Sequence, residues 1–358
     1  MENVTITDVA KYANVSTATV SNAINGTRGV SEELKNKVFR AIEELGYDVD
    51  YAARPVQKQT SMNVGVVVTS IQRIFFPEVL NGIQTMAEKY GYYVSFHVSH
   101  DNMDHERSIV KRLVDSKVDG IIIHTVSGTG NESRLSYLQG LGKNGKKIPV
   151  VSLERNLTGY HIPSVFIDNY LGGKLATEHL LEMGAKDIVC ITGPENSEVS
   201  NERMQAFVDV LNGYGYVDVV NNNVYHGDYS PLSGYRLMRR LLLDGLKPQG
   251  VFFCNDQMAV GAMNAINEYG LRIPEDIKIV GYDNTFVSSI TTPQFTTINV
   301  PKKRLGEEAF RLLLKRMKEV RKEEASDPVE GIKIPIDLIV RQSTSKTAQV
   351  YAWDLEDW

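Results

Sequence analysis

The sequence predicts an α/β protein that combines a small all-α amino-terminal part with a larger, two-lobed body built on parallel sheets. Residues 1 to about 46 show apolar residues at helical spacing and no strand-like run. From about residue 62, strand-sized apolar runs alternate with helical stretches, which is the pattern of parallel sheets covered by helices on both faces. About 280 residues exceed one such core, so we expect two lobes that meet near Ile162 and Pro163.

Composition and length are those of a globular protein. The 358 residues are 42% hydrophobic and 23% charged. No apolar run approaches the roughly 20 residues of a membrane span, and the start, Met1 to Thr5, lacks the features of an export signal. We therefore expect a cytoplasmic protein without a membrane partner. Cys190 and Cys254 each lie in an apolar run, which favours buried thiols over a disulfide or a metal site. The net charge of -5 argues, taken alone, against nucleic acid as a partner.

Three short amphipathic helices account for the amino-terminal part. Their apolar positions are Ile6, Val9, Ala10 and Ala13, then Val20, Ala23 and Ile24, and finally Leu34, Val38, Ala41, Ile42 and Leu45. Ser16 stands where the second helix needs an N-cap, and Ser31, followed by two glutamates, suits the start of the third helix. Gly46 suits the end of that helix.

The first two helices have the spacing of a helix-turn-helix. Thr5 to Ala13 forms the first helix, Asn14 to Ser16 the turn, and Thr17 to Ile24 the second helix. The second helix turns Thr17, Ala18, Ser21 and Asn22 outward, and these are short side chains that can reach base edges or phosphates in a major groove. On spacing alone, the same residues are also compatible with the plain polar surface of a helical subdomain.

The body begins after an irregular segment from Tyr47 to Ser61 that contains Pro55 and reads as a linker. The expected strands are Val64 to Val68, Tyr93 to Val98, Gly120 to His124, Val150 to Leu153, Val165 to Ile167, Ile188 to Thr192, Gly250 to Cys254 and Ile277 to Gly281. Helical stretches such as Glu78 to Tyr90 and Asp104 to Lys117 separate most of them.

The segment from Val4 to Gly26, Val-Thr-Ile-Thr-Asp-Val-Ala-Lys-Tyr-Ala-Asn-Val-Ser-Thr-Ala-Thr-Val-Ser-Asn-Ala-Ile-Asn-Gly, resembles the headpiece signature of the lac repressor/gal repressor (LacI/GalR) family. The resemblance continues through Val30 to Glu33 and Ala41 to Tyr47. It implies a transcriptional regulator that binds a pseudo-palindromic operator as a homodimer. The implied base contacts are Thr17, Ala18 and Asn22. The other implied DNA-binding residues are Thr5, Ser16, Thr19, Ser21, Asn25, Arg28 and the hinge residues Ala53, Arg54 and Val56.

The hinge departs from the family pattern. Family members usually carry a Pro-Asn pair and an Ala-Arg-x-Leu hinge helix, whereas this chain keeps Ala53-Arg54, places Pro55 next and has Val56 where the leucine wedge stands. Asp48 and Asp50 would repel phosphate, so we expect weaker hinge-helix formation and DNA bending. The expected domains are a headpiece (1–47), a hinge (48–61), a body (62–344) and a tail (345–358). Within the body, lobe 1 takes about 62–161 and 291–322, and lobe 2 about 162–290 and 323–344.

The body resembles the family along its length, which implies the two-lobed fold of periplasmic binding proteins with three crossovers and a ligand cleft at the carboxyl ends of the strands. Residues near the strand ends match the family's effector positions: Phe75, Phe76, Glu154, Arg203, Tyr229, Asn255 and Asp283. Aromatic rings with paired polar groups suit a polyhydroxylated ring. The two phenylalanines are equally compatible with the core. Asp256 reads as a helix cap, and Asp168-Asn169 as a cap or a lobe-interface support.

Two other groups of residues resemble known sites but do not meet the requirements of a phosphate loop or a metal site. The segment from Gly140 to Lys146 is close to the phosphate-loop motif, but Lys147 stands where that motif needs Ser or Thr. The segment also precedes a strand, whereas a phosphate loop follows one. His97, His100 and His105 lack ligand spacing, so a solvated turn is favoured over a metal site. We therefore expect no metal, no cofactor and no catalytic residue, and hence not an enzyme.

The sequence thus favours a ligand-responsive repressor of carbohydrate uptake or catabolism genes. A sugar or sugar-derived effector in the cleft would shift the orientation of the lobes and so the fit of two headpieces to operator half-sites. The alternatives are a cytosolic sugar-binding module without DNA function, an enzyme acting on a sugar, and a regulator whose co-effector is a nucleobase or a phosphoprotein.

Overall fold

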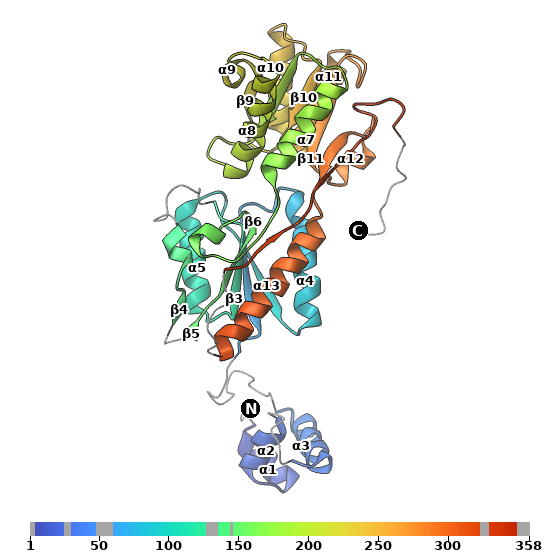
Figure 1. Ribbon diagram of the computed structural model, residues 1–358. Coiled ribbons are helices and arrows are strands. Elements are labelled where there is room, and N and C mark those ends of the chain that lie inside the picture. Colours follow the sequence, from blue (N-terminus) through green and yellow to red (C-terminus); the bar gives the residue numbers. More distant parts are fainter. Residues whose placement is uncertain are drawn as a thin grey trace. The chain divides into compact units, whose positions relative to one another are not determined.

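The computed structural model describes residues 4–24, 30–47, 60–126, 135–143, 146–322 and 329–348. The chain divides into two units, Met1–Thr60 and Ser61–Trp358. None of the described helices is long and apolar enough to cross a membrane. Both units are drawn in Figure 1.

The amino-terminal unit consists of three helices, α1 (Ile6–Ala13), α2 (Thr17–Ile24) and α3 (Glu32–Leu45). Val9, Val20 and Val38 are fully buried at the centre of its small core, one from each helix. The helices begin and end where the sequence predicts. The Ser16 and Ser31 hydroxyls accept from the backbone N–H of Thr19 and Leu34. Gly46 follows α3 with a left-handed φ of 62°, which glycine adopts without steric cost.

Lobe 1 of the body is a six-stranded parallel sheet in the order β13-β7-β6-β3-β1-β2. The strands are β1 (Asn63–Val68), β2 (Tyr93–Val98), β3 (Gly120–Ile123), β6 (Val150–Glu154), β7 (Ser164–Phe166) and β13 (Gly331–Lys333). Side chains alternate across the sheet. Val66 packs into the core beneath α4 (Phe75–Lys89) and α13 (Lys302–Lys322), and Val67 packs beneath α5 (Met103–Asp115). Helices therefore cover both faces, as predicted.

Lobe 2 is a second six-stranded sheet in the order β14-β12-β11-β10-β8-β9. Its strands are β8 (Ile188–Thr192), β9 (Val224–His226), β10 (Gly250–Phe253), β11 (Lys278–Asp283), β12 (Thr296–Asn299) and β14 (Asp337–Ile339). All pairs are parallel except β14 with β12, which is antiparallel. The helices of this lobe are α7 (Asn169–Glu182), α8 (Glu198–Gly213), α9 (Val219–Asn223), α10 (Pro231–Leu243), α11 (Asp256–Glu268) and α12 (Val287–Ile290). A small antiparallel hairpin, β4 (Gly142–Lys143) and β5 (Lys146–Lys147), stands apart from both sheets.

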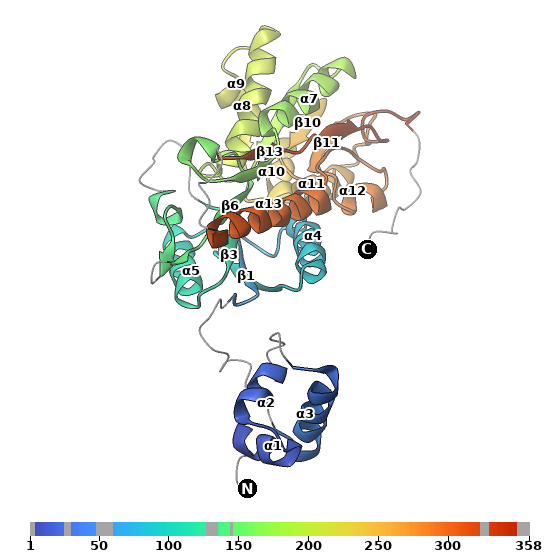
Figure 2. The same ribbon diagram turned by 60° about the horizontal axis from the view of Figure 1, so that its bottom comes forward.

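The chain crosses between the lobes three times, but not at the expected boundaries. β7 pairs with β6 of lobe 1, so the first crossing follows β7 instead of falling at Ile162 and Pro163. β12 pairs with β11 of lobe 2, and β13 pairs with β7 of lobe 1, so both strands lie in the lobe opposite to the one expected. These strands have three or four residues each, too few for a sequence pattern to assign them to a sheet. Helix α13 packs along α4 of lobe 1, as Figures 1 and 2 show.

The two cysteines lie in the core of lobe 2, Cys190 on β8 and Cys254 directly after the neighbouring strand β10. Their sulfur atoms are 4.0 Å apart, and both thiols are buried and free, as the apolar runs around them predict. His100 and His105 stack their rings 5.7 Å apart beside the start of α5. Within the described ranges, no group of three or more metal-ligating side chains comes together.

Candidate functional site

A cavity of about 40 Å³ opens between the lobes at the carboxyl ends of the parallel strands. This is the edge of an α/β sheet at which ligands bind in such folds. The cavity is lined by Arg73, Phe75, Phe76, His124, Glu154, Val199, Arg203, Tyr229, Asn255, Gln257 and Asp283. All seven residues that the sequence nominates for an effector are therefore brought together here, from strands and helices of both lobes.

Arg203 on α8 forms the centre of the site and is 2% exposed. Its Nε donates to Asn169 Oδ1 at 2.9 Å, its Nη1 to the carbonyl oxygen of Cys254 at 2.6 Å, and its Nη2 to Glu154 Oε1 at 3.1 Å. The guanidinium also lies 3.6 Å above the ring of Tyr282. Since Glu154 belongs to β6, this contact joins the two lobes directly.

The charge of Arg203 is held by its surroundings. Burial alone would lower the pKa of Arg203, but Tyr282 and the carboxylates of Asp283 and Glu154 outweigh burial and raise that pKa above its ordinary value. Arg203 therefore remains a cation at the base of the cavity. A buried cation fixed by hydrogen bonds can bind a hydroxyl, a carbonyl or an anionic oxygen of a ligand.

Glu154 ends β6 with a left-handed φ of 69°. Its Oε2 is 2.9 Å from His124 Nε2, and its Oε1 accepts from Arg203. Burial would raise the pKa of Glu154, but the hydrogen bond and charge of His124, together with the charge of Arg203, lower it. Nδ1 of His124 is buried and has no hydrogen-bond partner among the described residues. That atom is the one imidazole nitrogen that Glu154 leaves unbonded.

Asp283 ends β11 with a φ of 102°, and its Oδ1 lies 3.7 Å from Nη1 of Arg203. Burial raises the pKa of this carboxyl well above its ordinary value, and the nearby carboxylates of Asp256 and Glu154 raise it further. Lys302 holds the backbone here, since its Nζ donates to the carbonyl oxygens of Asp283 and Asn284 at 2.8 Å each. Asp283 can therefore meet a ligand as an acid that donates or as a carboxylate that accepts.

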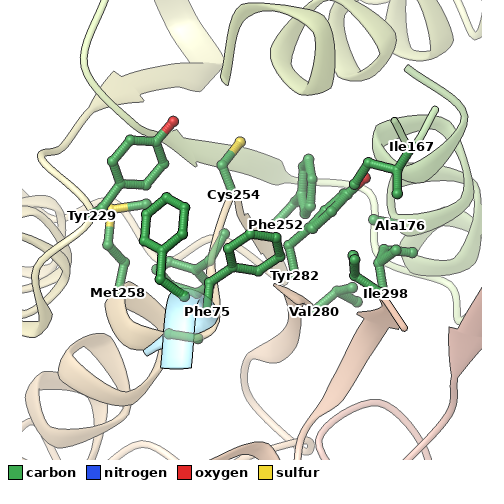
Figure 3. Close-up of a cluster of buried hydrophobic side chains, with 14 of the residues drawn as sticks. Phe75, Ile167, Ala176, Tyr229, Phe252, Cys254, Met258, Val280, Tyr282 and Ile298 are labelled. Atoms are coloured by element: carbon green, nitrogen blue, oxygen red, sulfur yellow. The ribbon is translucent and has the colours of Figure 1, made fainter. Parts of the chain in front are cut away.

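Aromatic rings form the apolar wall of the cavity. Phe75 and Phe76 begin α4 and pack edge to face with centroids 5.4 Å apart, and Phe76 packs in the same way on His124 at 5.2 Å. Tyr229 lies opposite on lobe 2, and its hydroxyl bonds the hydroxyls of Ser197 and Ser200. Figure 3 shows Phe75 and Tyr229 beside Cys254 and Tyr282 in this buried cluster. The two phenylalanines thus belong both to the core and to the cavity wall.

Asn255, and not Asp256, caps α11, although Asn255 also lines the cavity as the sequence predicts. Asn255 is the N-cap of α11, with Oδ1 accepting from the N–H of Met258 at 3.0 Å and Nδ2 donating to the carbonyl oxygen of Tyr229 at 3.0 Å. Asp256 is no cap. Its buried carboxylate accepts from Thr285 and Thr297 and so ties α11 to the loop after β11 and to β12. Asn255 therefore keeps only part of its hydrogen-bonding capacity for a ligand.

Asp168 and Asn169 cap a helix and support the lobe interface, the two roles that the sequence suggests for them. Asp168 caps α7 by accepting from the N–H of Leu171 at 2.8 Å and pairs with Lys333 on β13 at 2.6 Å. Asn169 orients Arg203 from behind. Burial alone would raise the pKa of Asp168, but the hydrogen bond from Lys333 lowers it.

Four cavity residues were missed by sequence reasoning: Arg73, His124, Val199 and Gln257. His124 follows β3 directly, so the strand-end rule used for the other residues could have found it. Arg73 contacts the side chains of Thr69, Asp101 and Tyr229, whereas Gln257 acts through main-chain partners. Gln257 Oε1 accepts from the N–H of Ile74 at 2.9 Å, and its Nε2 donates to the carbonyl oxygen of Gln72 at 3.2 Å. A sequence pattern does not predict hydrogen bonds from a side chain to the main chain of a distant segment.

The headpiece presents a polar face on α2. Thr17, Ala18 and Asn22 are exposed, and Ser21 is half-buried. Ser16 caps the helix, and its hydroxyl lies 2.8 Å from that of Thr19. Thr5 caps α1, with its N–H and its hydroxyl both donating to Asp8. The remaining residues expected to bind DNA, Asn25, Arg28, Ala53, Arg54 and Val56, lie outside the described residues, as does most of the hinge.

Comparisons with known proteins cover both units. Residues 5–50 match the model described as "Bacterial regulatory proteins, lacI family", and residues 177–344 match a periplasmic binding protein-like domain. The chain is 34% identical over 339 residues to the HTH-type transcriptional repressor PurR of Pasteurella multocida, covering 95% of this chain and 98% of that protein. It is 36% identical over 327 residues to PurR of Serratia proteamaculans, covering 91% and 93%.

Solved structures agree with this likeness. The lac repressor dimer bound to operator and the anti-inducer ONPF matches with a TM-score of 0.83 and 28% identity, covering 96% of this chain and 99% of that one. The complex of the transcriptional regulator CelR with cellobiose matches with a TM-score of 0.67 and 29% identity, covering 95% and 99%. The expected fold, a helix-turn-helix headpiece with a periplasmic-binding-protein-like body, is confirmed.

Proposed function

Since the chain belongs to the lacI family of bacterial regulatory proteins, we propose that it is a DNA-binding transcriptional repressor whose affinity for an operator is set by a small polyhydroxylated molecule in the interlobe cleft. Its relatives are transcriptional repressors, which agrees with the expectation that the chain is not an enzyme. The observation that carries the effector proposal is the cluster of Arg203, Glu154 and Asp283 facing aromatic rings from both lobes.

A sugar-like ring suits this cluster. Glu154 and Asp283 offer carboxyl oxygens to adjacent hydroxyls, Arg203 offers donors between them, and Tyr229 or Phe75 can cover an apolar ring face. The similar solved structure of the transcriptional regulator CelR is a complex with cellobiose. Because Arg203 and Glu154 come from different lobes, a ligand bound between them favours one orientation of the lobes over another. In a homodimer, that orientation sets the distance between two headpieces and so their fit to operator half-sites.

A nucleobase is the second candidate, because curated relatives at 34 to 36% identity are PurR repressors. The face of Tyr229 can stack a planar base, and Nδ1 of His124 and the Arg203 guanidinium can bond its polar edge. The two candidates share one site and differ in the ligand that stabilises the folded protein.

A thermal-shift screen of the full-length protein against sugars and purine bases separates them, since a bound ligand stabilises the native state by mass action. The Asp283→Ala variant should lose the shift while remaining folded by circular dichroism. Asp244→Ala, which changes an exposed aspartate elsewhere in lobe 2, is the matched control and should keep it. A shift retained in Asp283→Ala would refute the proposed site.

DNA binding is tested by selection of random duplexes with the full-length protein, in the presence and absence of the ligand found above. We expect a pseudo-palindromic site. Asn22→Ala should relax base preference at one position of each half-site, with a cost of about 1–3 kcal/mol at that position. Absence of any sequence preference would overturn the repressor assignment and favour a sugar-binding module.

A further inference from the structure

We propose that Arg73 competes with the effector for the ring face of Tyr229, and that the segment Ser70–Ile74 is a lid whose closed position Arg73 and Gln257 hold. This inference rests on the proposed function of the cleft as the effector site. In this inference Arg73 lowers the affinity for the effector, whereas Arg203 raises it by binding the effector.

Arg73 reaches across the cleft from lobe 1 to lobe 2. It lies between β1 and α4, and its guanidinium carbon is 4.4 Å from the centroid of the Tyr229 ring. Nη1 donates to Thr69 Oγ1 at 3.0 Å, and Nη2 donates to Asp101 Oδ2 at 2.7 Å. Its side chain is only 18% exposed. The guanidinium is thus held on the ring by two partners of its own lobe, and it covers the face on which a ligand ring would stack.

Gln257 binds the main chain on either side of Arg73. Its amide accepts from the N–H of Ile74 at 2.9 Å and donates to the carbonyl oxygen of Gln72 at 3.2 Å. Gln257 is the second residue of α11 in lobe 2, so these bonds also cross the cleft. The Gln257 side chain therefore bonds one main-chain donor and one main-chain acceptor of the lid, and Arg73 lies between these two bonded residues.

The space left in the cleft requires something to move. The cavity holds about 40 Å³, whereas pockets for small organic ligands measure on the order of 300 Å³ or more. Arg203 and Glu154 are buried and paired at the base, and the phenylalanines are fixed by the core. Arg73 and its lid are partly exposed, and among the described residues they contact lobe 2 through Tyr229 and Gln257. Displacing Arg73 from Tyr229 opens the ring face without breaking the core.

Amide hydrogen exchange of the full-length protein tests the lid without any ligand. In Arg73→Ala and in Gln257→Ala, the Ile74 amide should exchange at least about five-fold faster than in the wild type, because the lid loses one of its two holds. Arg107→Ala is the matched control, since Arg107 lies 5.5 Å over the ring of Tyr137 away from the cleft. It should leave Ile74 exchange unchanged. An unchanged rate at Ile74 in Arg73→Ala would overturn the proposal.

Calorimetric titration of cellobiose and of hypoxanthine tests the competition. For whichever probe the wild type binds, Arg73→Ala should bind it about 2- to 30-fold more tightly, the range expected when a cation–π contact no longer has to be broken. Arg107→Ala should bind it as the wild type does. Equal or weaker binding by Arg73→Ala would make Arg73 a bystander or an effector contact and would overturn the proposal.

The two measurements also separate this inference from the proposed function. If Ile74 exchange accelerates as expected and neither probe binds any variant, the lid stands and the effector class is wrong. Hydrogen exchange and calorimetry do not involve DNA. Both therefore test the lid even if the protein fails to bind an operator.

Discussion

Each nitrogen of the Arg203 guanidinium has a hydrogen-bond partner. Replacing Arg203 therefore tests both the candidate site and the contact between the lobes. Asn169 and the Cys254 carbonyl take two of its donors, and Glu154 takes a third from the opposite lobe. A buried charge is tolerated when it is paired and fully bonded, and breaking such a group leaves its partners buried without compensation. Arg203 is therefore both a candidate ligand contact and a structural link between lobes.

Arg203→Ala should abolish the ligand-induced thermal shift and lower the free energy of unfolding by about 2–4 kcal/mol at pH 7. The loss should be nearly the same at pH 5 and should shrink only as the pH falls below about 4.5, the ordinary pKa of a glutamate. The lowered pKa of Glu154 gives stability that is present above its unfolded pKa and lost as the pH falls through the folded pKa, and the variant forgoes the part supplied by Arg203. Urea unfolding at pH 7, at pH 5 and at about pH 3.5 measures this. Arg272→Ala, which removes an exposed arginine of lobe 2, is the control and should change stability little.

Asp256 gives a second pH dependence, of opposite sign. Burial raises the pKa of Asp256 to about 6, against the lowering effects of Thr297 and Thr285. The folded state thus binds a proton more readily than the unfolded chain. This contribution to stability is fully present below the unfolded pKa of about 3.9 and is lost as the pH rises through about 6.

Lowering the pH from 7 to 5 should therefore stabilise the wild type by about 1 kcal/mol more than Asp256→Asn, which has no proton to gain. Denaturant unfolding at the two pH values gives the difference directly. Parallel pH profiles for wild type and variant would show that Asp256 remains ionised in the folded protein throughout this range.

The nominated cleft residues could be found from the sequence because they follow strand ends or match family positions, and the fold brings strand ends together. The roles of Asn255 and Asp256 could not, since both are short polar residues before a helix and either can cap it. Which one caps depends on Thr285 and Thr297, residues 29 and 41 positions away along the chain. Gln257 was missed because main-chain partners leave no trace in residue types, and Arg73 because its side-chain partners are spread over both lobes.

At the scale of elements, close helix pairs rely on glycine. A Cβ on Gly82 of α4 would lie 2.1 Å from the carbonyl oxygen of Lys303 on α13, and a Cβ on Gly306 of α13 would lie 2.1 Å from that of Val79 on α4. The same reciprocal arrangement joins Gly234 of α10 with Gly261 of α11. Backbone carbonyls cannot give way as a flexible side chain can, so the helices must separate if either glycine gains a side chain.

Gly306→Ala should lower the free energy of unfolding by about 1–3 kcal/mol and, because α4 carries Phe75 and Phe76 into the cleft, weaken the ligand-induced thermal shift as well. Gly213→Ala is the matched control. Gly213 ends α8, and a Cβ there meets nothing within 4 Å. It should be neutral or slightly stabilising, since alanine favours helix. Equal stability of the two variants in thermal unfolding would show that α4 and α13 adjust at little cost.

The helix caps of the amino-terminal unit and the strand positions were predictable because each depends on residues close in sequence, as Ser16, Ser31 and Gly46 show. Assignment of strands to lobes was not. β7, β12 and β13 have three or four residues, and their sheet is decided by partners far along the chain. Local pattern thus gives the elements, whereas crossovers depend on pairings that no single segment encodes.

At the scale of the whole molecule, the family assignment outweighs the charge. Residues 1–60 carry seven basic and eight acidic residues, a net charge of -1, although they include the headpiece. Contacts to DNA also come from neutral donors and helix termini, and Ser16, Thr17 and Asn22, which the sequence nominates for such contacts, are exposed. A low net charge therefore does not exclude DNA binding, but it limits the part of the affinity that comes from phosphate neutralisation.

The salt dependence of operator binding should consequently be shallow. Each phosphate neutralised contributes a slope of about -0.9 to a plot of log K against log salt, so we expect a slope for the full-length protein shallower than about -5. Binding to a scrambled duplex should be weak at the same salt, because little non-specific attraction remains once base contacts are lost. Fluorescence anisotropy on both duplexes from 50 to 200 mM salt, a range over which strongly basic binders lose about 10³ or more in affinity, makes the comparison. A slope near -10 would mean that basic groups outside residues 1–60 reach the DNA.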